Sequence, residues 1–143
     1  MSVLLDLGEH LRWLIVPEAD LTEPEARECA TTFMRTVAEP ALQTVREELA
    51  SAGYDPAIEH ADGEIALTVP RTDGPSFRFA VAAEIFHKMG FAFPAFHGKK
   101  HRPRHVRIVL TSPSQTRYRR PSRLDQETLV ELCRRSARKW LDW

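Results

Sequence analysis

Cysteine is scarce in this sequence: its 143 residues include only Cys29 and Cys133, which lie far apart and form no C-x-x-C pair. This scarcity argues against a disulfide framework and against a thiolate zinc site. No apolar run approaches the roughly 20 residues that a helix needs to cross a bilayer. Residues 1–16 also lack the basic leader and small-residue cleavage site of a secretory signal. We therefore expect no transmembrane segment, a cytoplasmic location and reduced thiols.

The chain has no net charge, but its charges are unevenly distributed. Residues 1–98 contain 7 Lys and Arg against 16 Asp and Glu, whereas residues 99–143 contain 13 against 4. The two parts therefore carry net charges of −9 and +9. Either the second part presents a basic face to an anionic partner, or the two parts neutralise each other on folding. Pairing of basic residues with Glu47, Glu48 or Glu64 would favour neutralisation.

Motifs of nucleophilic catalysis and of phosphate-binding loops are missing. The chain contains no G-x-S-x-G elbow and no glycine-rich phosphate loop, and most of its six glycines lie at expected turns. Glu64 and Glu84 are the candidates for an acid/base pair, but carboxylates on alternating strands usually face water. We predict no catalytic residue and no cofactor.

Apolar residues recur at helical spacing in three segments. The first helix is expected at residues 7–16. The second begins with the capping box Thr22-Glu23-Pro24-Glu25 and ends near Ala52, where Gly53 supplies a left-handed residue. Pro40 predicts a kink at residues 36–40 of that helix. The last helix begins at a possible box over residues 122–125 and reaches Leu141.

Between the second and last helices the apolar residues alternate with a period of two, which indicates strands. Residues 57–60 and 64–69 form a predicted hairpin around Asp62-Gly63, and further strands are expected at 76–86 and 106–110. Residues 89–96 are interpreted as an irregular edge strand or an aromatic loop, and residues 112–120 as a polar turn region. Residues 1–143 are therefore predicted to form a single α+β domain. It would be a two-layer sandwich in which about four antiparallel strands carry the long N-terminal helix and the C-terminal helix on one face.

Three histidines, His97, His101 and His105, recur every four residues. On a helix this spacing would place imidazoles on one face, where they could bind a metal ion. Gly98 and Pro103 argue against such a helix, and the lysines and arginines between the histidines would repel a divalent cation. We predict no metal site.

Aromatic and basic residues are concentrated in the region 91–123, which is the candidate binding region. The lysines and arginines could neutralise phosphates, and the phenylalanines could stack on bases or form an exposed apolar patch. The predicted partner-binding residues are Phe91, Phe93, Phe96, Lys99, Lys100, Arg102, Arg104, Arg117, Arg119 and Arg120.

Several stretches resemble the cytoplasmic C-terminal domain of bacterial betaine/choline/carnitine transporters of the choline-uptake type. The resemblance rests on Leu11–Ile15, Phe33–Leu42, Val45–Leu49 with Gly53, Leu67–Val69, Phe77–Val81, Phe91–Pro94, Val106–Leu110, Ser114-Gln115 and the C-terminal helix. It spans nearly the whole chain, but none of its motifs is short and diagnostic. The family continues after its Gln with Gly-Tyr-Asp, whereas this chain has Thr116-Arg117-Tyr118, which puts in doubt any contact that an acidic residue makes there. The resemblance implies a regulatory or sensory module, here without a transporter before it.

Together these features predict a non-catalytic regulatory or protein-interaction module, connected with transporter regulation or with sensing of osmotic or ionic conditions. The expected partner is a protein, including a membrane protein or a second copy of the chain in a homodimer. The alternative is a nucleic-acid-binding protein that uses the basic region 97–123. A third interpretation, a small-molecule-binding fold or weak enzyme, requires a closed pocket lined by the phenylalanines.

Overall fold

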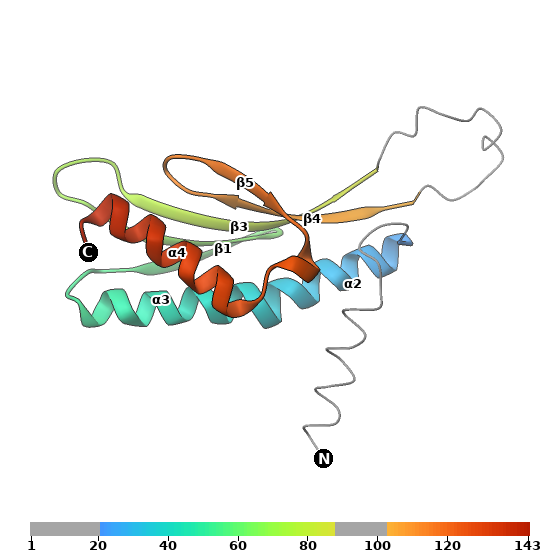
Figure 1. Cartoon of the computed structure of the whole chain (residues 1–143), viewed down its shortest axis with the longest axis horizontal. Helices are drawn as coiled ribbons and strands as arrows, with labels where there is room; N and C mark the ends of the chain where they lie inside the picture. Colours follow the sequence, from blue (N-terminus) through green and yellow to red (C-terminus); the bar gives the residue numbers. More distant parts are fainter. Residues whose placement is uncertain (1–20, 88–102) are drawn as a thin grey trace, which may run out of the picture.

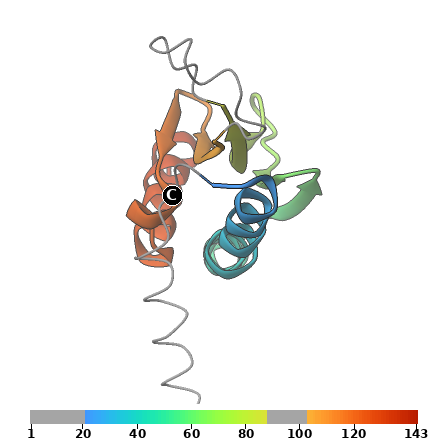
Figure 2. The ribbon, with the colours of Figure 1, turned by 90° about the vertical axis from the view of Figure 1, so that its right-hand side faces the viewer.

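The computed structural model describes residues 21–87 and 103–143 of the chain. Within these ranges, a five-stranded antiparallel sheet with the order β1-β2-β3-β4-β5 packs against helices. Figure 2 shows both long helical stretches on the same side of the sheet, and no helix of the described residues covers the other side. The predicted α+β class is confirmed, with five strands where about four were expected. The expected helix at 7–16 and the uncertain segment at 89–96 lie outside the described residues.

The first long helical stretch consists of α2 (Glu23–Phe33), the π-helical segment η1 (Met34–Ala38) and α3 (Glu39–Ser51) (Figure 1). Its start is as predicted: Thr22 accepts a hydrogen bond from the Glu25 amide at 3.3 Å, and the Glu25 carboxylate accepts one from the Thr22 amide at 2.9 Å. This reciprocal pair satisfies two amides that lack a partner within the helix.

The π-helical segment overlaps the predicted kink. Proline has no amide hydrogen, and its ring crowds the carbonyl four residues earlier, which here belongs to Thr36. The amide of Glu39 donates to the carbonyl of Met34, five residues back, and so makes the wider π-type turn immediately before Pro40. The helical path therefore continues past the proline as α3.

The sheet begins with the predicted hairpin of β1 (Ala57–Ala61) and β2 (Glu64–Val69), in whose turn Gly63 adopts a φ of +71°. β3 (Phe77–Phe86) pairs with both β2 and β4 (His105–Thr111). β5 (Thr116–Arg119) then pairs with β4 at the edge. The prediction of a polar turn over residues 112–120 was wrong for β5, because this edge strand carries no apolar alternation that would mark it.

The C-terminal helix α4 (Gln126–Leu141) follows a short 3-10 helix, η3 (Pro121–Arg123). The predicted box at residues 122–125 placed the helix start too early. The side chain of Asp125 is the cap and accepts a hydrogen bond from the Thr128 amide at 2.7 Å. Tyr54, just after α3, donates to the Leu141 carbonyl at 3.1 Å and so joins the ends of the two helices.

The core lies between the helices and one face of the sheet. It contains Phe33, Leu42 and Leu49 from the helices before the sheet, Phe77 and Val81 from β3, and Leu129, Cys133 and Ala137 from α4. Opposite residues of an antiparallel ladder lie on the same face, and successive residues alternate between faces. The register therefore assigns the remaining side chains of β1–β5 to the uncovered face.

Candidate interaction surface

The uncovered face is the sheet surface opposite the helices, and its side chains come from all five strands. In the observed register, the row Glu64, Ala82, Val109 and Tyr118 lies beside the row Ala66, Ala80, Thr111 and Thr116. Farther along the same face are the opposed pairs Glu84–Arg107 and Phe86–His105. The face therefore has alanines at its centre and longer side chains around them.

An ion pair crosses the alanines at its centre. Ala66 and Ala80 are opposite each other on β2 and β3, and Glu64 and Arg78 lie one step to either side on the same face. The Arg78 guanidinium donates a hydrogen bond to the Glu64 carboxylate. Ala66 is only 1% exposed and Ala80 only 2%, although both lie on the side that none of the described helices covers. The ion pair contributes to this burial in the way that long arginine side chains do, by laying their methylene groups over apolar surface while the head stays at the carboxylate.

Arg107 on β4 is the centre of the second group on this face. Its Nε and Nη2 donate to the two oxygens of Glu84, both at 3.1 Å. The hydrogen bond to Glu84 raises the pKa of Arg107, so the residue is charged throughout the physiological range. The guanidinium carbon lies 4.8 Å from the ring centroid of Phe86 and 4.5 Å from that of Tyr118. Arg107 therefore combines a two-point ion pair with cation–π contacts to two rings.

Tyr118 is the outermost residue of this group. It is 54% exposed, whereas Phe86 is only partly accessible and stacks on His105 at a centroid separation of 5.4 Å. A tyrosine with an accessible ring beside a fixed arginine is typical of residues that make strong contributions at protein interfaces. We call Glu84, Phe86, Arg107 and Tyr118 the Arg107 cluster.

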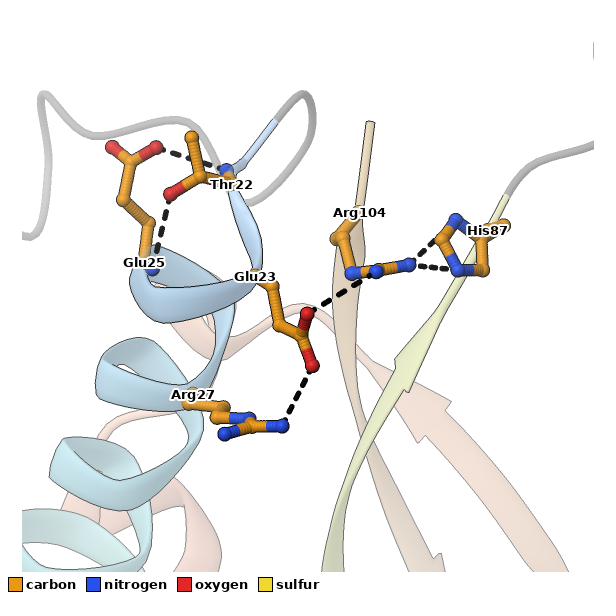
Figure 3. A network of polar contacts seen from close by, with 6 residues as sticks. All are labelled: Thr22, Glu23, Glu25, Arg27, His87 and Arg104. Atoms are coloured by element: carbon orange, nitrogen blue, oxygen red, sulfur yellow. Dashed lines mark hydrogen bonds and ion pairs between the residues drawn. The ribbon is translucent and has the colours of Figure 1, made fainter. Parts of the chain in front are cut away.

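Arg104 lies away from this cluster, beside the start of α2 (Figure 3). Its backbone forms an antiparallel bridge with Leu21, and its guanidinium donates to Glu23 at 3.5 Å and contacts the His87 ring. Glu23 also accepts from Arg27 at 2.6 Å. Arg104, one of the predicted binding residues, is therefore partly neutralised and joins the beginning of β4 to α2.

A further ion pair, between Glu48 and Arg134, connects α3 to α4. Arg134 Nε donates to a Glu48 oxygen at 2.8 Å, and a second guanidinium nitrogen donates to the other oxygen. The hydrogen bond from Arg134 holds the pKa of Glu48 below its ordinary value. The pairs Glu23–Arg104, Glu84–Arg107 and Glu48–Arg134 each join an acidic residue of the first part of the chain to an arginine of the second. Part of the charge asymmetry is thus neutralised within the fold.

The structure separates the other predicted binding residues. Phe91, Phe93, Phe96, Lys99, Lys100 and Arg102 lie outside the described residues. Arg117 and Arg119 have register partners in the core, Leu110 and Ile108, and so lie on the helix side of β5. Arg119 donates to the Tyr118 carbonyl at 3.0 Å, and Arg120 is exposed after the strand.

Glu64 and Glu84, the candidates for an acid/base pair, lie on the same face but belong to separate ion pairs with arginines. His105 stacks on Phe86, whereas His97 and His101 lie outside the described residues. In the described ranges, no group of three metal-binding side chains comes together. Cys133 is buried, and this burial raises the pKa of its thiol, which leaves little reactive thiolate at neutral pH.

Comparison with protein families and with curated proteins identified no relative of this chain. No protein-family model matches the chain, and no curated protein matches it significantly. The resemblance to the transporter C-terminal domain therefore stays a prediction. Within residues 21–87 and 103–143, no helix has the length and apolar character needed to span a membrane.

Sequence reasoning missed the Arg107 cluster. The period of two in β3 placed Glu84 and Phe86 on the same side of that strand, and this signal was readable. Their position opposite Arg107 and His105 depends on the β3–β4 register, which connects segments separated by the residues 88–102. The local residue pattern of β3 or of β4, taken alone, does not reveal the register between these two strands.

Proposed function

We propose that this chain is a non-catalytic regulatory module that acts through protein–protein contact, with the uncovered face of the sheet as the contact surface. The observation that carries the proposal is the Arg107 cluster. It presents an accessible tyrosine beside an arginine that already has a bound carboxylate. Covering an arginine that is paired leaves no lone charge without a partner, so a protein can bury this surface at a lower electrostatic cost than an unpaired cation would impose.

A second copy of the chain is the partner that we propose. The face carries both signs of charge, with Glu64 paired to Arg78 and Glu84 paired to Arg107, so two copies would not repel each other there. Most homo-oligomers are two-fold symmetric and use the same patch on both subunits, which requires a self-complementary surface of this kind. Tyrosine and arginine are the residue types enriched where such interfaces derive most of their energy.

The regulatory part of the proposal rests on the resemblance to the transporter domain and on the ion pairs between the two parts of the chain. Charge pairs at the surface are screened as the ionic strength rises, with a screening length of about 8 Å at physiological salt. The pairs of Arg104, Arg107 and Arg134 are partly accessible to solvent. They provide the module with contacts that respond to salt.

The charge pairing supports this proposal over the nucleic-acid alternative. Two arginines of the predicted basic region, Arg104 and Arg107, have carboxylate partners, which offset part of the positive charge that a phosphate backbone would need. Arg120 and Arg123 remain exposed and keep the alternative testable.

The experiment measures the mass of the purified chain by light scattering over a wide range of protein concentration. We expect a dimer for the wild type, a monomer for the double variant Arg107→Ser/Tyr118→Ser, and a dimer for the control Arg123→Ser, which removes an exposed cation from η3. Single- and double-stranded oligonucleotides are added in parallel at low and physiological salt. A chain that is monomeric throughout and binds oligonucleotides with a steep salt dependence would reject the proposal in favour of nucleic-acid binding.

A further inference from the structure

A small groove lies between the β4–β5 hairpin and α4, away from the uncovered face. Its volume is about 130 Å³, and its lining comes from the hairpin turn, from Arg117 on β5 and from one stripe of α4. Leu110 and Leu132 form part of its apolar lining, and Ser114 and Ser136 contribute hydroxyl groups.

Two elements bring positive charges together at this groove. On α4, Leu132, Arg135, Ser136 and Lys139 are spaced at i, i+3, i+4 and i+7, so they lie on one side of the helix. On β5, Arg117 is opposite Leu110 and therefore lies on the helix side of the sheet. The groove is thus lined by Arg117, Arg135 and Lys139.

The positive charge of this groove is only slightly offset by the rest of the described chain. Its lining contains no Asp or Glu. Arg135 has Glu131 as an ion-pair partner at 3.7 Å, but the Arg135 side chain is 72% exposed, and Glu131 is shared with Arg134. Within the described residues, Arg117 and Lys139 have no ion-pair partner. Cations held close together repel each other, and an anion bound between them relieves this repulsion.

We propose that this groove binds a phosphate monoester, with Arg117 and Lys139 as its main charged ligands. Three cationic side chains match a doubly charged oxyanion better than a single carboxylate, and hydroxyl donors complete the set that phosphate oxygens accept. The groove volume of about 130 Å³ is several times what a single water molecule needs. That space admits a phosphoryl group and its ester carbon, which Leu110 and Leu132 can contact, and leaves the rest of the ligand outside. This site goes beyond the proposed function and uses the opposite side of the sheet.

The test is a titration of the purified full chain with inorganic phosphate and with glycerol phosphate, followed by amide chemical shifts, with sodium chloride of equal ionic strength as the reference. We expect saturable shifts at residues 112–117 and 132–139. The change Arg117→Gln or Lys139→Gln should weaken binding roughly tenfold, because each removes a charge-assisted hydrogen bond. The control Arg123→Gln removes an exposed cation that does not line the groove and should change the affinity less than about twofold, because salt screens exposed charges that do not contact the ligand.

A second arm distinguishes a free ester from a lipid headgroup with the same chemistry. The chain is sedimented with vesicles of phosphatidylcholine, with or without phosphatidic acid. Saturable binding of glycerol phosphate assigns the site to soluble esters. Sedimentation only with phosphatidic acid vesicles, if it is lost in Arg117→Gln, assigns the site to the lipid.

The proposal would be overturned if sodium chloride produced the same amide shifts as phosphate. It would also be overturned if the phosphate affinities of Arg117→Gln, Lys139→Gln and Arg123→Gln were equal. The variant Arg107→Ser/Tyr118→Ser, which tests the uncovered face, should keep its phosphate binding, so the two proposals can fail separately.

Discussion

Arg134 on α4 donates hydrogen bonds to both carboxylate oxygens of Glu48 on α3, 86 residues earlier in the chain. The two side chains are 29% and 30% exposed, so water screens the pair only in part. No other ion pair in the described ranges joins these two helices directly. The contact therefore links α4 to α3 beside their shared core.

We expect this pair to contribute measurably to the free energy of unfolding. In a double-mutant cycle of Glu48→Gln and Arg134→Gln, the coupling energy should be about 1 kcal/mol, at the upper end of the range for surface pairs. The control is the cycle of Arg71 and Asp73, a pair at 3.3 Å whose aspartate is 76% exposed, and its coupling should stay below about 0.5 kcal/mol. Urea denaturation measures both cycles. Equal coupling in the two would show that the bidentate geometry adds nothing.

The same pair makes stability depend on pH. Since the hydrogen bond from Arg134 lowers the pKa of Glu48 below 4.5 in the folded protein, folding favours the ionised carboxylate. The stabilisation is complete above pH 4.5 and is lost as the pH falls through the lower folded-state pKa. The stability difference between the wild type and Glu48→Gln should be constant near neutral pH and shrink in acid. A difference that grows on acidification would contradict the direction of the pKa shift.

Much of the fold was readable because its signals are local. The Thr22–Glu25 capping box, the apolar stripe through Phe33 and Leu49, and Gly53 at the helix end each act within a few residues of their own position. Such signals are independent of the rest of the chain, and the structure places the long helical stretch where they predict it. The hairpin turn at Gly63 is local in the same sense.

The edge strand and the ion pairs were not readable for the opposite reason. β5 is a strand because β4 supplies backbone partners, whereas its own residues Thr116–Arg119 are all polar or aromatic and mostly exposed. The partners of Arg107 and Arg134 are 23 and 86 residues away and meet them only after the sheet and helices have packed. The uneven distribution of charge along the sequence predicted that acidic and basic residues could neutralise each other on folding. It did not identify which residues would pair.

Asp125 should be the residue on which the start of α4 depends. Its carboxylate accepts from the Thr128 amide, and the pKa of Asp125 is lowered first by the Thr128 side chain and then by this amide. We expect Asp125→Ala to reduce the free energy of unfolding by about 1 kcal/mol, whereas Asp125→Asn keeps a capping oxygen and should cost only a few tenths. Thermal and urea denaturation at neutral pH compare the three proteins. A loss as large for asparagine as for alanine would mean that charge, and not capping, is the contribution.

Two glycines should respond to alanine with opposite signs. Gly53 follows α3 with a φ of +94°, and a Cβ there would have no atom within 4 Å, so the effect of Gly53→Ala comes from backbone conformation alone. Alanine in the left-handed region costs about 1 kcal/mol, and the variant should be destabilised by that amount.

Gly74 has no positive φ. Its added Cβ would lie 3.8 Å from the nearest atom, which belongs to the Arg71 side chain, and this is an ordinary contact. Gly74→Ala should therefore stabilise the protein by about 0.5 kcal/mol, because alanine restricts the unfolded chain without straining the folded one. Urea denaturation measures both effects as shifts of the midpoint, provided that the slope of the unfolding free energy against urea is unchanged. If the two midpoints shifted in the same direction, the assignment of a left-handed conformation to Gly53 but not to Gly74 would be contradicted.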